Sequence, residues 1–224
     1  RDGVWEYFDK NGVLEKKIHY EDGQQGLYEI FDKGEIQKGH FKNDKRDGVW
    51  EYFDKNGVLE KKIYWEDGKQ GLYEGFDKQG RLIKTGNHNV LGDKHGIWET
   101  FYENGQTEWK ENYINGKHNG LWKKFHENSE LETRGKYNNG KQEGNWEYFD
   151  EDGNLETKEV YYVNGQLESR RKYKNGERDG LSEKFNENGQ TEWKENYING
   201  KRNGLWEWFN ENGQLSLKQN YKNG

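Results

Sequence analysis

The chain has 224 residues, of which 35% are charged and 16% aromatic, and its formal net charge is −6. Disordered chains are usually poor in aromatic residues and unbalanced in charge, so this composition favours an ordered protein. The sequence contains no cysteine, which excludes disulfides, and no excess of basic residues of the kind that nucleic-acid-binding proteins use.

Turn dipeptides recur along the whole chain, beginning with Asn11-Gly12 and Asp22-Gly23. Within unbroken stretches the interval is 11 to 13 residues, which leaves room for one strand between successive turns. Asn-Gly and Asp-Gly supply the two consecutive positive φ angles of a type I′ turn, the preferred two-residue connection of a β-hairpin. We therefore predict an all-β protein, an elongated antiparallel meander of stacked β-hairpins that forms a single twisted or curled layer like a solenoid.

The pattern Gly-x-Trp-Glu-x-Phe, with substitutions, opens nine repeat units. The interval between units is 22 to 25 residues, as in solenoid proteins, except for one step of 36. We assign the longer step to an extra strand at 166–174, which in a strict meander reverses the direction of the units after it. Residues 1–18 recur at 46–63, so we expect 1–224 to be one continuous array that belongs to a longer chain. The units start at Gly3, Gly26, Gly48, Gly71, Gly96, Gly120, Gly144, Gly180 and Gly204.

The expected turns determine which residues face each other. A two-residue turn at Asn11-Gly12 places Glu6 opposite Lys17, whereas a four-residue loop would place it opposite Glu15, a like-charge pair that destabilises a sheet. We prefer the two-residue turn because it gives a Glu–Lys pair in seven of the nine units. These pairs are Glu6–Lys17, Glu29–Lys38, Glu51–Lys62, Glu99–Lys110, Glu147–Lys158, Glu183–Lys194 and Glu207–Lys218, and the other two units give Glu74–Thr85 and Lys123–Arg134.

The same register places the opening glycine of eight units opposite an aromatic residue. An aromatic ring that covers a strand glycine stabilises a sheet, and we interpret the glycines in this way. The pairs are Gly3–Tyr20, Gly26–Phe41, Gly48–Trp65, Gly96–Tyr113, Gly120–Tyr137, Gly144–Tyr161, Gly180–Tyr197 and Gly204–Tyr221, and Gly71 faces His88.

Side chains alternate across a sheet, so we expect an aromatic face and a charged face. Phe8, which recurs in every unit, falls among the charged residues; either a bulge before the turn reorients it or the second face is partly apolar. In the first hairpin the aromatic face carries Trp5, Tyr7, Leu14, Ile18 and Tyr20, and the charged face carries Glu6, Glu15, Lys17 and His19.

Four tryptophans are the candidate interaction surface. The later turns place Trp109 opposite Trp122 and Trp193 opposite Trp206, and we expect the aromatic face to stay on one side of the sheet across consecutive hairpins. One interpretation is that these rings are simply buried, since a sheet has to cover its apolar face. The other is that part of the face lines a groove, because no segment reads as a helix that would cover it.

The recurring glutamates define the other surface. This row either attracts a basic partner or forms a solvated face that the opposite lysines neutralise, and we prefer the second interpretation. The row contains Glu6, Glu29, Glu51, Glu74, Glu99, Glu147, Glu183 and Glu207.

Two sequence patterns recur over essentially the whole chain, most clearly at 48–71, 96–120 and 180–204: Gly-x-Trp-Glu-Tyr-Phe-Asp-x-Asn-Gly-x-Leu and Tyr-x-Asn-Gly-Lys-x-x-Gly. These patterns resemble the bacterial MORN-repeat variant. The resemblance implies an elongated antiparallel sheet of hairpins that serves as an interaction scaffold. Bacterial members of the family are described as antitoxins or surface proteins, and the family supplies no catalytic residues to transfer.

Candidate sites for chemistry are few. None of the six histidines lies in a HxxxH or HExxH arrangement, although His88 and His95 share an irregular connection and could meet in space. The run Asp150–Gly153 is better explained as a hairpin turn than as a calcium loop, because the bidentate glutamate of such a loop is missing. We therefore expect no enzyme activity, no catalytic or metal-binding residue and no cofactor.

The expected partner is another protein of unknown identity, or a second copy of the chain that pairs with an open sheet edge. The alternative is a glycan or cell-wall component that stacks on the regularly spaced Trp and Tyr rings. We expect no binding to nucleic acid and no membrane insertion, and the sequence leaves open whether the protein is cytoplasmic or lies at the cell surface.

Overall fold

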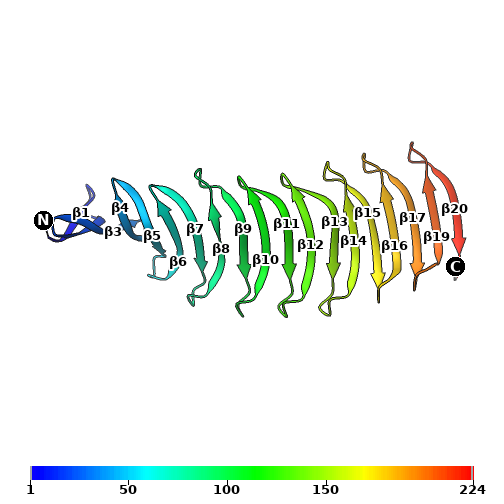
Figure 1. Ribbon diagram of the computed structural model, residues 1–224, viewed down its shortest axis with the longest axis horizontal. Coiled ribbons are helices and arrows are strands. Elements are labelled where there is room, and N and C mark those ends of the chain that lie inside the picture. Colours follow the sequence, from blue (N-terminus) through cyan, green and yellow to red (C-terminus); the bar gives the residue numbers. More distant parts are fainter. Residues whose placement is uncertain (1, 223) are drawn as a thin grey trace. The chain divides into compact units, whose positions relative to one another are not determined.

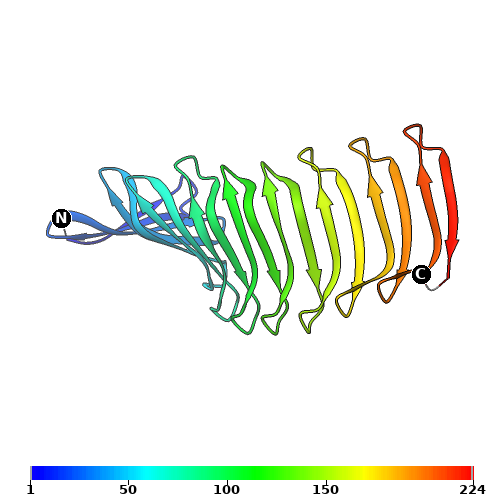
Figure 2. The ribbon, with the colours of Figure 1, turned by 45° about the vertical axis from the view of Figure 1, so that its right-hand side comes forward.

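The computed structural model describes residues 2–222 and 224, and every regular element in this range is a β-strand. The chain forms two compact units, Arg1–Thr107 and Glu108–Gly224. Within each unit the strands follow one another as an open antiparallel meander (Figures 1 and 2), which confirms the predicted fold class. Arg1, the first residue of the predicted array 1–224, and Asn223, in the last predicted turn, lie outside the described residues.

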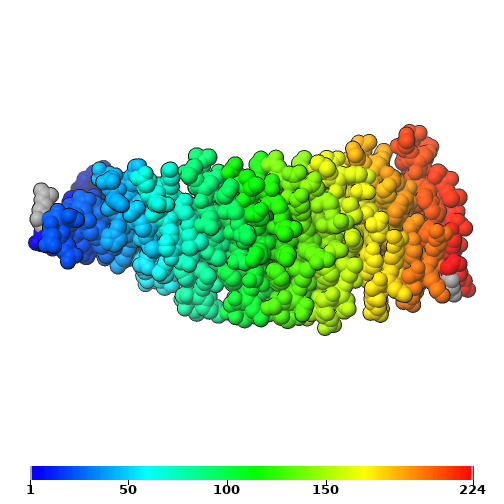
Figure 3. Space-filling model, viewed as in Figure 1, coloured from blue at the N-terminus to red at the C-terminus, as the bar shows by residue number. Residues whose placement is uncertain are grey.

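The described residues contain twenty strands, and the boundary between the two units follows Thr107, the first residue of β10 (Thr107–Ile114). In the space-filling view each hairpin occupies its own band of the surface, as expected when each strand packs against the strands before and after it in the chain (Figure 3). The first unit contains β1 (Gly3–Phe8), β2 (Leu14–Glu21), β3 (Gln24–Asp32), β4 (Glu35–Lys42), β5 (Lys45–Phe53), β6 (Leu59–Glu66), β7 (Lys69–Phe76), β8 (Leu82–His88) and β9 (Lys94–Phe101). The second contains β10 (Thr107–Ile114), β11 (Lys117–Phe125), β12 (Leu131–Asn138), β13 (Lys141–Phe149), β14 (Leu155–Tyr161), β15 (Leu167–Lys174), β16 (Glu177–Phe185), β17 (Thr191–Ile198), β18 (Lys201–Arg202), β19 (Gly204–Phe209) and β20 (Leu215–Tyr221).

The predicted pairing of charged residues is confirmed. Six of the seven expected Glu–Lys pairs lie within one unit, and in all six the two residues are directly opposite each other. The pairs are Glu6–Lys17, Glu29–Lys38, Glu51–Lys62, Glu147–Lys158, Glu183–Lys194 and Glu207–Lys218.

Two kinds of connection alternate along most of the chain, and only one is the predicted two-residue turn. At Asp22-Gly23 both φ angles are positive, as a type I′ turn requires. At Asn11-Gly12 only Gly12 has a positive φ. There the amide of Gly12 donates to the carbonyl oxygen of Asp9 at 3.0 Å, and the Asp9 carboxylate accepts hydrogen bonds from the amides of Asn11 and Val13, both at 2.8 Å. The prediction of a two-residue turn is therefore wrong at this connection.

The strands keep the expected register because one extra residue in β2 compensates for the longer loop. Glu6 and Tyr7 face Lys17 and Lys16, but Phe8 faces Leu14, so Glu15 is a bulge in β2. Since directly opposite residues share a face, Leu14 lies on the charged face with Phe8 and not on the aromatic face as predicted. The bulge leaves the alternation of Phe8 unchanged, so the charged face is partly apolar.

The opening glycines face the predicted aromatic residues for a different reason from the one expected. Gly3 and Gly48 have φ angles of +98° and +70°, and a Cβ atom added to either would meet nothing within 4 Å. These glycines are therefore needed for backbone conformation and not for contact with a ring. Gly48 lies in a bulge, because Lys38 faces Glu51 while His40 faces Asp47.

The glycines that do lie under rings are on the strands before the tryptophans. A Cβ atom added to Gly39, Gly86 or Gly135 would lie between 2.1 and 2.3 Å from an indole carbon. The three indoles are almost fully buried, since a flat ring rests directly on a backbone that carries no side chain. The pairs are Gly39 with Trp50, Gly86 with Trp98, and Gly135 with Trp146.

Strand β15, in the segment expected to hold the extra strand, changes the side of the sheet that the aromatic residues occupy. Trp146 faces Glu159, Glu159 faces Arg170, and Arg170 faces Glu183. Ser182, which holds the tryptophan position of its repeat, therefore lies on the opposite side of the sheet from Trp146. Within the second unit, the prediction of a single aromatic side is correct from β10 to β14 and wrong after β15.

We expect Gly86→Ala to destabilise the first unit, because the added methyl group overlaps the Trp98 ring. Overpacking of this kind lowers the free energy of unfolding by about 1–3 kcal/mol, which urea denaturation followed by circular dichroism would measure. Gly71→Ala in β7 is the control, since its Cβ would make only an ordinary contact at 3.4 Å and its φ is not positive. An equal loss in both variants would contradict the proposed ring-on-glycine packing.

Candidate interaction surface

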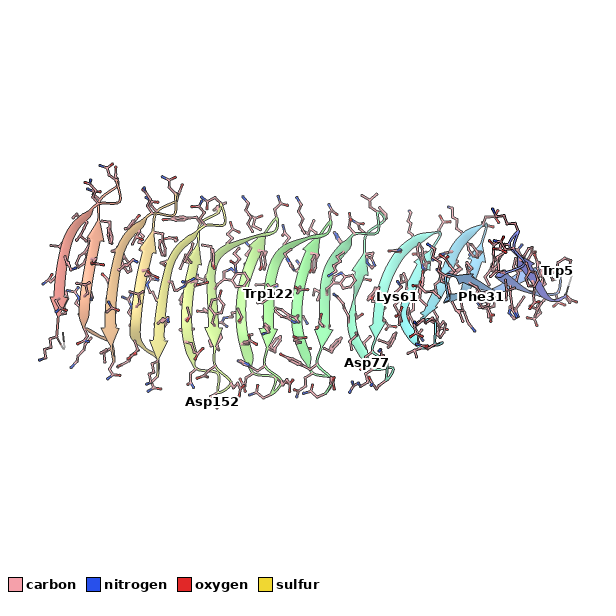
Figure 4. All side chains as sticks on the ribbon, turned by 180° about the vertical axis from the view of Figure 1, so that it is seen from behind. Trp5, Phe31, Lys61, Asp77, Trp122 and Asp152 are labelled. Atoms are coloured by element: carbon pink, nitrogen blue, oxygen red, sulfur yellow. The ribbon has the colours of Figure 1, made fainter. Side chains whose placement is uncertain are left out.

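One group of aromatic rings, which we name the Trp122 surface, spans β10 to β13 in the second unit. Trp122 lies within β11 (Figure 4). Its ring centroid is 5.0 Å from that of Trp109 and 5.3 Å from that of Trp146, and Tyr137 contacts Trp146 at 5.1 Å. These separations and tilted orientations are favourable for aromatic pairs. The Trp122 surface comprises Trp109, Tyr113, Trp122, Tyr137 and Trp146.

The rings of this surface are covered to different extents. Trp146 is only 2% exposed, whereas Trp109 and Trp122 are half-buried. The Lys124 ammonium lies 5.2 Å from the centroid of Trp109 and is itself paired with Glu132 at 2.7 Å. Trp146 is therefore buried, whereas Trp109 and Trp122 remain partly accessible, and a groove at these two tryptophans stays a prediction.

A glutamate, Glu111, lies at the centre of the Trp122 surface. Its carboxylate accepts hydrogen bonds from the Trp122 indole at 3.3 Å and the Tyr113 hydroxyl at 3.1 Å, and it pairs with His118 Nε2 at 3.0 Å. The His118 ring also stacks on Tyr137, with 4.8 Å between centroids. Burial, reinforced by the charge of Glu111, raises the pKa of Tyr113. The tyrosine therefore remains a neutral donor that holds the carboxylate in place.

A second carboxylate, Glu159, repeats this arrangement on β14 and is more deeply buried, at 5% exposure. It accepts hydrogen bonds from Arg170 Nε at 2.6 Å, the Tyr161 hydroxyl at 2.7 Å and the Tyr148 hydroxyl at 2.8 Å. Burial alone would raise the pKa of Glu159, but these three donors outweigh it and hold the pKa below its ordinary value. The side chain is therefore a buried anion whose charge is balanced by Arg170.

These buried glutamates were not predicted, although a signal for one of them was present. The register that gave the Glu–Lys pairs also places Trp146 opposite Glu159, at the position that Ile18 and Ile63 hold in the first unit. A charged residue at a position expected to be apolar marks it as unusual. Two of the three donors around Glu159, Tyr148 and Arg170, come from the neighbouring strands β13 and β15, so the full set becomes evident only when the strands are assembled.

The aromatic residues after β15 form a separate group on the opposite side of the sheet, which we name the Trp206 surface. Trp206 is 1% exposed, and its indole donates to the carbonyl oxygen of Asn196 at 2.9 Å. The Arg202 guanidinium lies 4.3 Å from the Trp206 ring centroid, close enough for a cation–π interaction. The Trp206 surface comprises Trp193, Tyr197, Trp206, Trp208 and Tyr221.

The four candidate tryptophans thus fall into two pairs on opposite sides of the sheet. Trp109 contacts Trp122 but faces Lys124, and Trp193 faces Trp208 instead of Trp206. The predicted opposite positions are wrong by two residues because the bulge at the opening glycine shifts the register. A shift of two residues preserves the face, so each predicted pair still shares one side of the sheet.

Six of the recurring glutamates pair with lysine, namely Glu6, Glu29, Glu51, Glu147, Glu183 and Glu207. Glu6 and Lys17 are 2.7 Å apart, and Glu51 and Lys62 are 3.0 Å apart. Glu147 pairs with Arg134 at 2.6 Å as well as with Lys158 at 3.4 Å. Exposed pairs of this type contribute little stability, but they neutralise the face, as in the interpretation we preferred.

The other candidate sites do not assemble. His88 faces Lys94 and His95 faces Asn87, so the two histidines point to opposite sides of β8 and β9. The Asp150 carboxylate accepts hydrogen bonds from the amides of Asp152 and Asn154, which makes this segment a hairpin connection, and Asp152 lies at the hairpin end in Figure 4. In the described range we find no cluster of three or more potential metal ligands.

Residues 2–222 and 224 also contain no helix with the length and apolar character needed to cross a bilayer.

Comparison with protein families gives one clear match. A family model described as MORN repeat variant matches six segments, which together cover more than half of the chain: residues 1–22, 46–67, 94–117, 119–139, 142–164 and 202–223. A search of curated protein sequences found no significant match.

Similarity to solved structures is weak. A structure of S. aureus TarM is 20% identical over 46% of this chain and 20% of its own, with a TM-score of 0.36. The TcdB2-TccC3 structure is 11% identical over 97% and 18% of the two chains, with a TM-score of 0.23. CbpJ from Streptococcus pneumoniae is 14% identical over 96% and 94%, with a TM-score of 0.19. The chain spans about a fifth of the length of TarM.

We expect Glu159→Gln to lower the free energy of unfolding at pH 7 by about 1–3 kcal/mol, because charge-assisted hydrogen bonds are lost from a buried site. The folded pKa of Glu159 lies below the unfolded value, so its stabilisation is present above about pH 4.3 and disappears as pH falls through the folded pKa. The difference between wild type and variant should therefore shrink in acid, as measured by urea denaturation at several pH values. Glu156→Gln, at an exposed position of the same strand, is the control, and a pH-independent difference would contradict the assignment.

Proposed function

The chain belongs to the MORN repeat variant family, and from this premise we propose that it is a non-catalytic scaffold that binds another protein, or a second copy of itself, through the Trp122 surface. The observation that supports the proposal best is the partial exposure of Trp109 and Trp122 in the middle of a sheet. The described part of the second unit contains only this sheet, so neither a helix nor a second sheet covers the rings.

The composition of the surface suits protein recognition. Tryptophan and tyrosine are enriched among residues that dominate binding energy at protein interfaces, where large rings fill pockets of the partner. Glu111 and His118 fix the orientation of Trp122 and Tyr137, so little side-chain freedom is lost on binding. A preorganised aromatic centre with polar groups around it is the usual anatomy of such an interface.

Electrostatics contributes less to this proposal. The glutamates of the charged face are neutralised by neighbouring lysine and arginine side chains, and the chain as a whole carries a net charge of only −6. Recognition should therefore depend on ring contacts and shape, with modest sensitivity to salt. The proposal contains no catalytic step, because the carboxylates of Glu111 and Glu159 have tyrosine, histidine and arginine partners that hold them in place.

Affinity capture with matched variants tests the proposal. We expect Trp122→Ala and Trp109→Ala to reduce retention of the partner at least about fivefold relative to wild type, because truncation of a central aromatic residue costs more than 1 kcal/mol. Leu121→Ala is the control: Leu121 is adjacent to Trp122, 68% exposed and on the other side of β11. Quantitative mass spectrometry of the retained proteins, with circular dichroism of each variant, provides the measurement.

The outcomes are distinct. A protein that is retained by wild type and Leu121→Ala but lost with both tryptophan variants supports a partner at the Trp122 surface. If a second copy of this protein is retained by wild type and Leu121→Ala but lost with both tryptophan variants, the result supports self-association, which sedimentation analysis would confirm. If all folded variants retain the same set of proteins to the same extent, the Trp122 surface is not the binding site and the proposal fails.

A further inference from the structure

The second unit has a hollow of about 900 Å³ on the other side of the sheet from the Trp122 surface. It lies where the loop between β16 and β17 adjoins the loop between β19 and β20. Its aromatic lining residues are Phe209 and the two tryptophans Trp193 and Trp208, which are directly opposite each other on β17 and β19. The volume is in the range of small-molecule binding sites.

A second copy of one lining segment of this hollow occurs elsewhere in the chain and allows a comparison. Residues 105–117 and 189–201 have the same sequence, so Trp109 and Trp193 occupy identical local segments. On the following strand Trp109 faces Lys124, whose ammonium lies over its ring, whereas Trp193 faces a second indole, Trp208. On the preceding strand Trp193 faces Lys184, whose ammonium is paired with Glu192. The two sites therefore differ in the residue opposite the tryptophan on the following strand: a lysine faces Trp109, whose ring contacts Trp122 at 5.0 Å, and a second indole faces Trp193.

Carboxamide groups surround the two rings. The Asn186 and Asn210 side chains are occupied, because each accepts hydrogen bonds from two amides of its own loop. Asn188 and Asn212 also line the hollow, and within the described residues their side chains make no hydrogen bond. A carboxamide offers both donors and an acceptor, which matches the mixed hydrogen bonding of hydroxyl groups.

The charge of the hollow limits the ligand further. Its ionisable lining residues are glutamates, and one of them, Glu192, is already paired with Lys184 at 2.8 Å. No arginine or lysine lines the hollow in the described part of the chain, so an anionic ligand would meet repulsion without compensation. The electron-rich faces of indoles instead favour C–H groups that carry a small positive charge, as on the face of a pyranose ring.

We propose that this hollow binds an uncharged oligosaccharide, with one or two pyranose rings stacked on Trp193 and Trp208 and their hydroxyl groups hydrogen-bonded by Asn188 and Asn212. This site is separate from the Trp122 surface and does not depend on it. The extra strand β15 is the reason for the separation, because it places the tryptophans of the later repeats on the other side of the sheet.

Titration of the intact chain with maltohexaose, cellohexaose and chitohexaose, up to about 10 mM, tests the proposal by isothermal calorimetry and tryptophan fluorescence. We expect saturable binding of at least one of these neutral hexasaccharides, and at least about tenfold weaker binding by Trp193→Ala and by Trp208→Ala. Trp109→Ala, in the identical sequence segment, should bind within about twofold of wild type. An oligogalacturonate of the same length should not bind, because it is anionic.

A second variant keeps the test decisive if a tryptophan substitution impairs folding. The double substitution Asn188→Ala and Asn212→Ala changes only exposed side chains without partners, and we expect it to weaken binding by about three- to tenfold while the circular dichroism spectrum stays unchanged. Absence of saturable binding by all three neutral sugars overturns the proposal. The proposal is also overturned if the Trp193→Ala and Trp208→Ala variants bind the neutral sugar as well as wild type does, or if Trp109→Ala weakens binding as much as they do. Binding of the oligogalacturonate with the same affinity as the neutral sugar would overturn it as well.

Discussion

Opposite residues of an antiparallel pair project to the same side of the sheet, and almost every feature of this protein depends on that geometry. It brings Glu147 next to Lys158 on one side of the second unit and Trp146 next to Glu159 on the other. Since no helix or second sheet covers either side in the described residues, each unit has to obtain its packing from contacts between neighbouring strands. Trp50, Trp98 and Trp146 achieve this by lying flat on glycines of the preceding strand, where a ring replaces the missing side chain and excludes water from the backbone.

The longer loops and the bulges preserve this geometry because the residues that they add leave the paired side chains on their original sides of the sheet. A loop that is one residue longer is followed by a one-residue bulge at Glu15, so the pairing of Glu6 with Lys17 is restored. The bulge at Gly48 shifts the register by two residues, and such a shift leaves every side chain on its original side. A shift of one residue there would have moved the indoles among the lysines. Positive φ at the opening glycine is what makes this bulge possible.

The extra strand β15 has the largest consequence for function. With one strand inserted, the repeats that follow run in the opposite direction, and their aromatic positions lie on the other side of the sheet. The second unit therefore has a Trp122 surface and a Trp206 surface on opposite sides, with a different environment at each. The carboxylates of Glu111 and Glu159 organise the first, and carboxamide-bearing loops border the second at Trp193 and Trp208. Two partners of different chemistry would not compete for space on such a sheet.

The sequence by itself determined the all-β class, the repeat period and the Glu–Lys register, because turn dipeptides and alternation act over a few residues. It also placed Phe8 on the charged side, although the choice between its two explanations needed the structure. Only the assembled strands decided that Leu14 leaves the aromatic side, that Trp193 faces Trp208, and that Glu159 gathers three donors. These features depend on the exact position of bulges and on contacts between residues of different strands. A single bulge residue is not visible in a periodic sequence, yet it changes the neighbours of every residue beyond it.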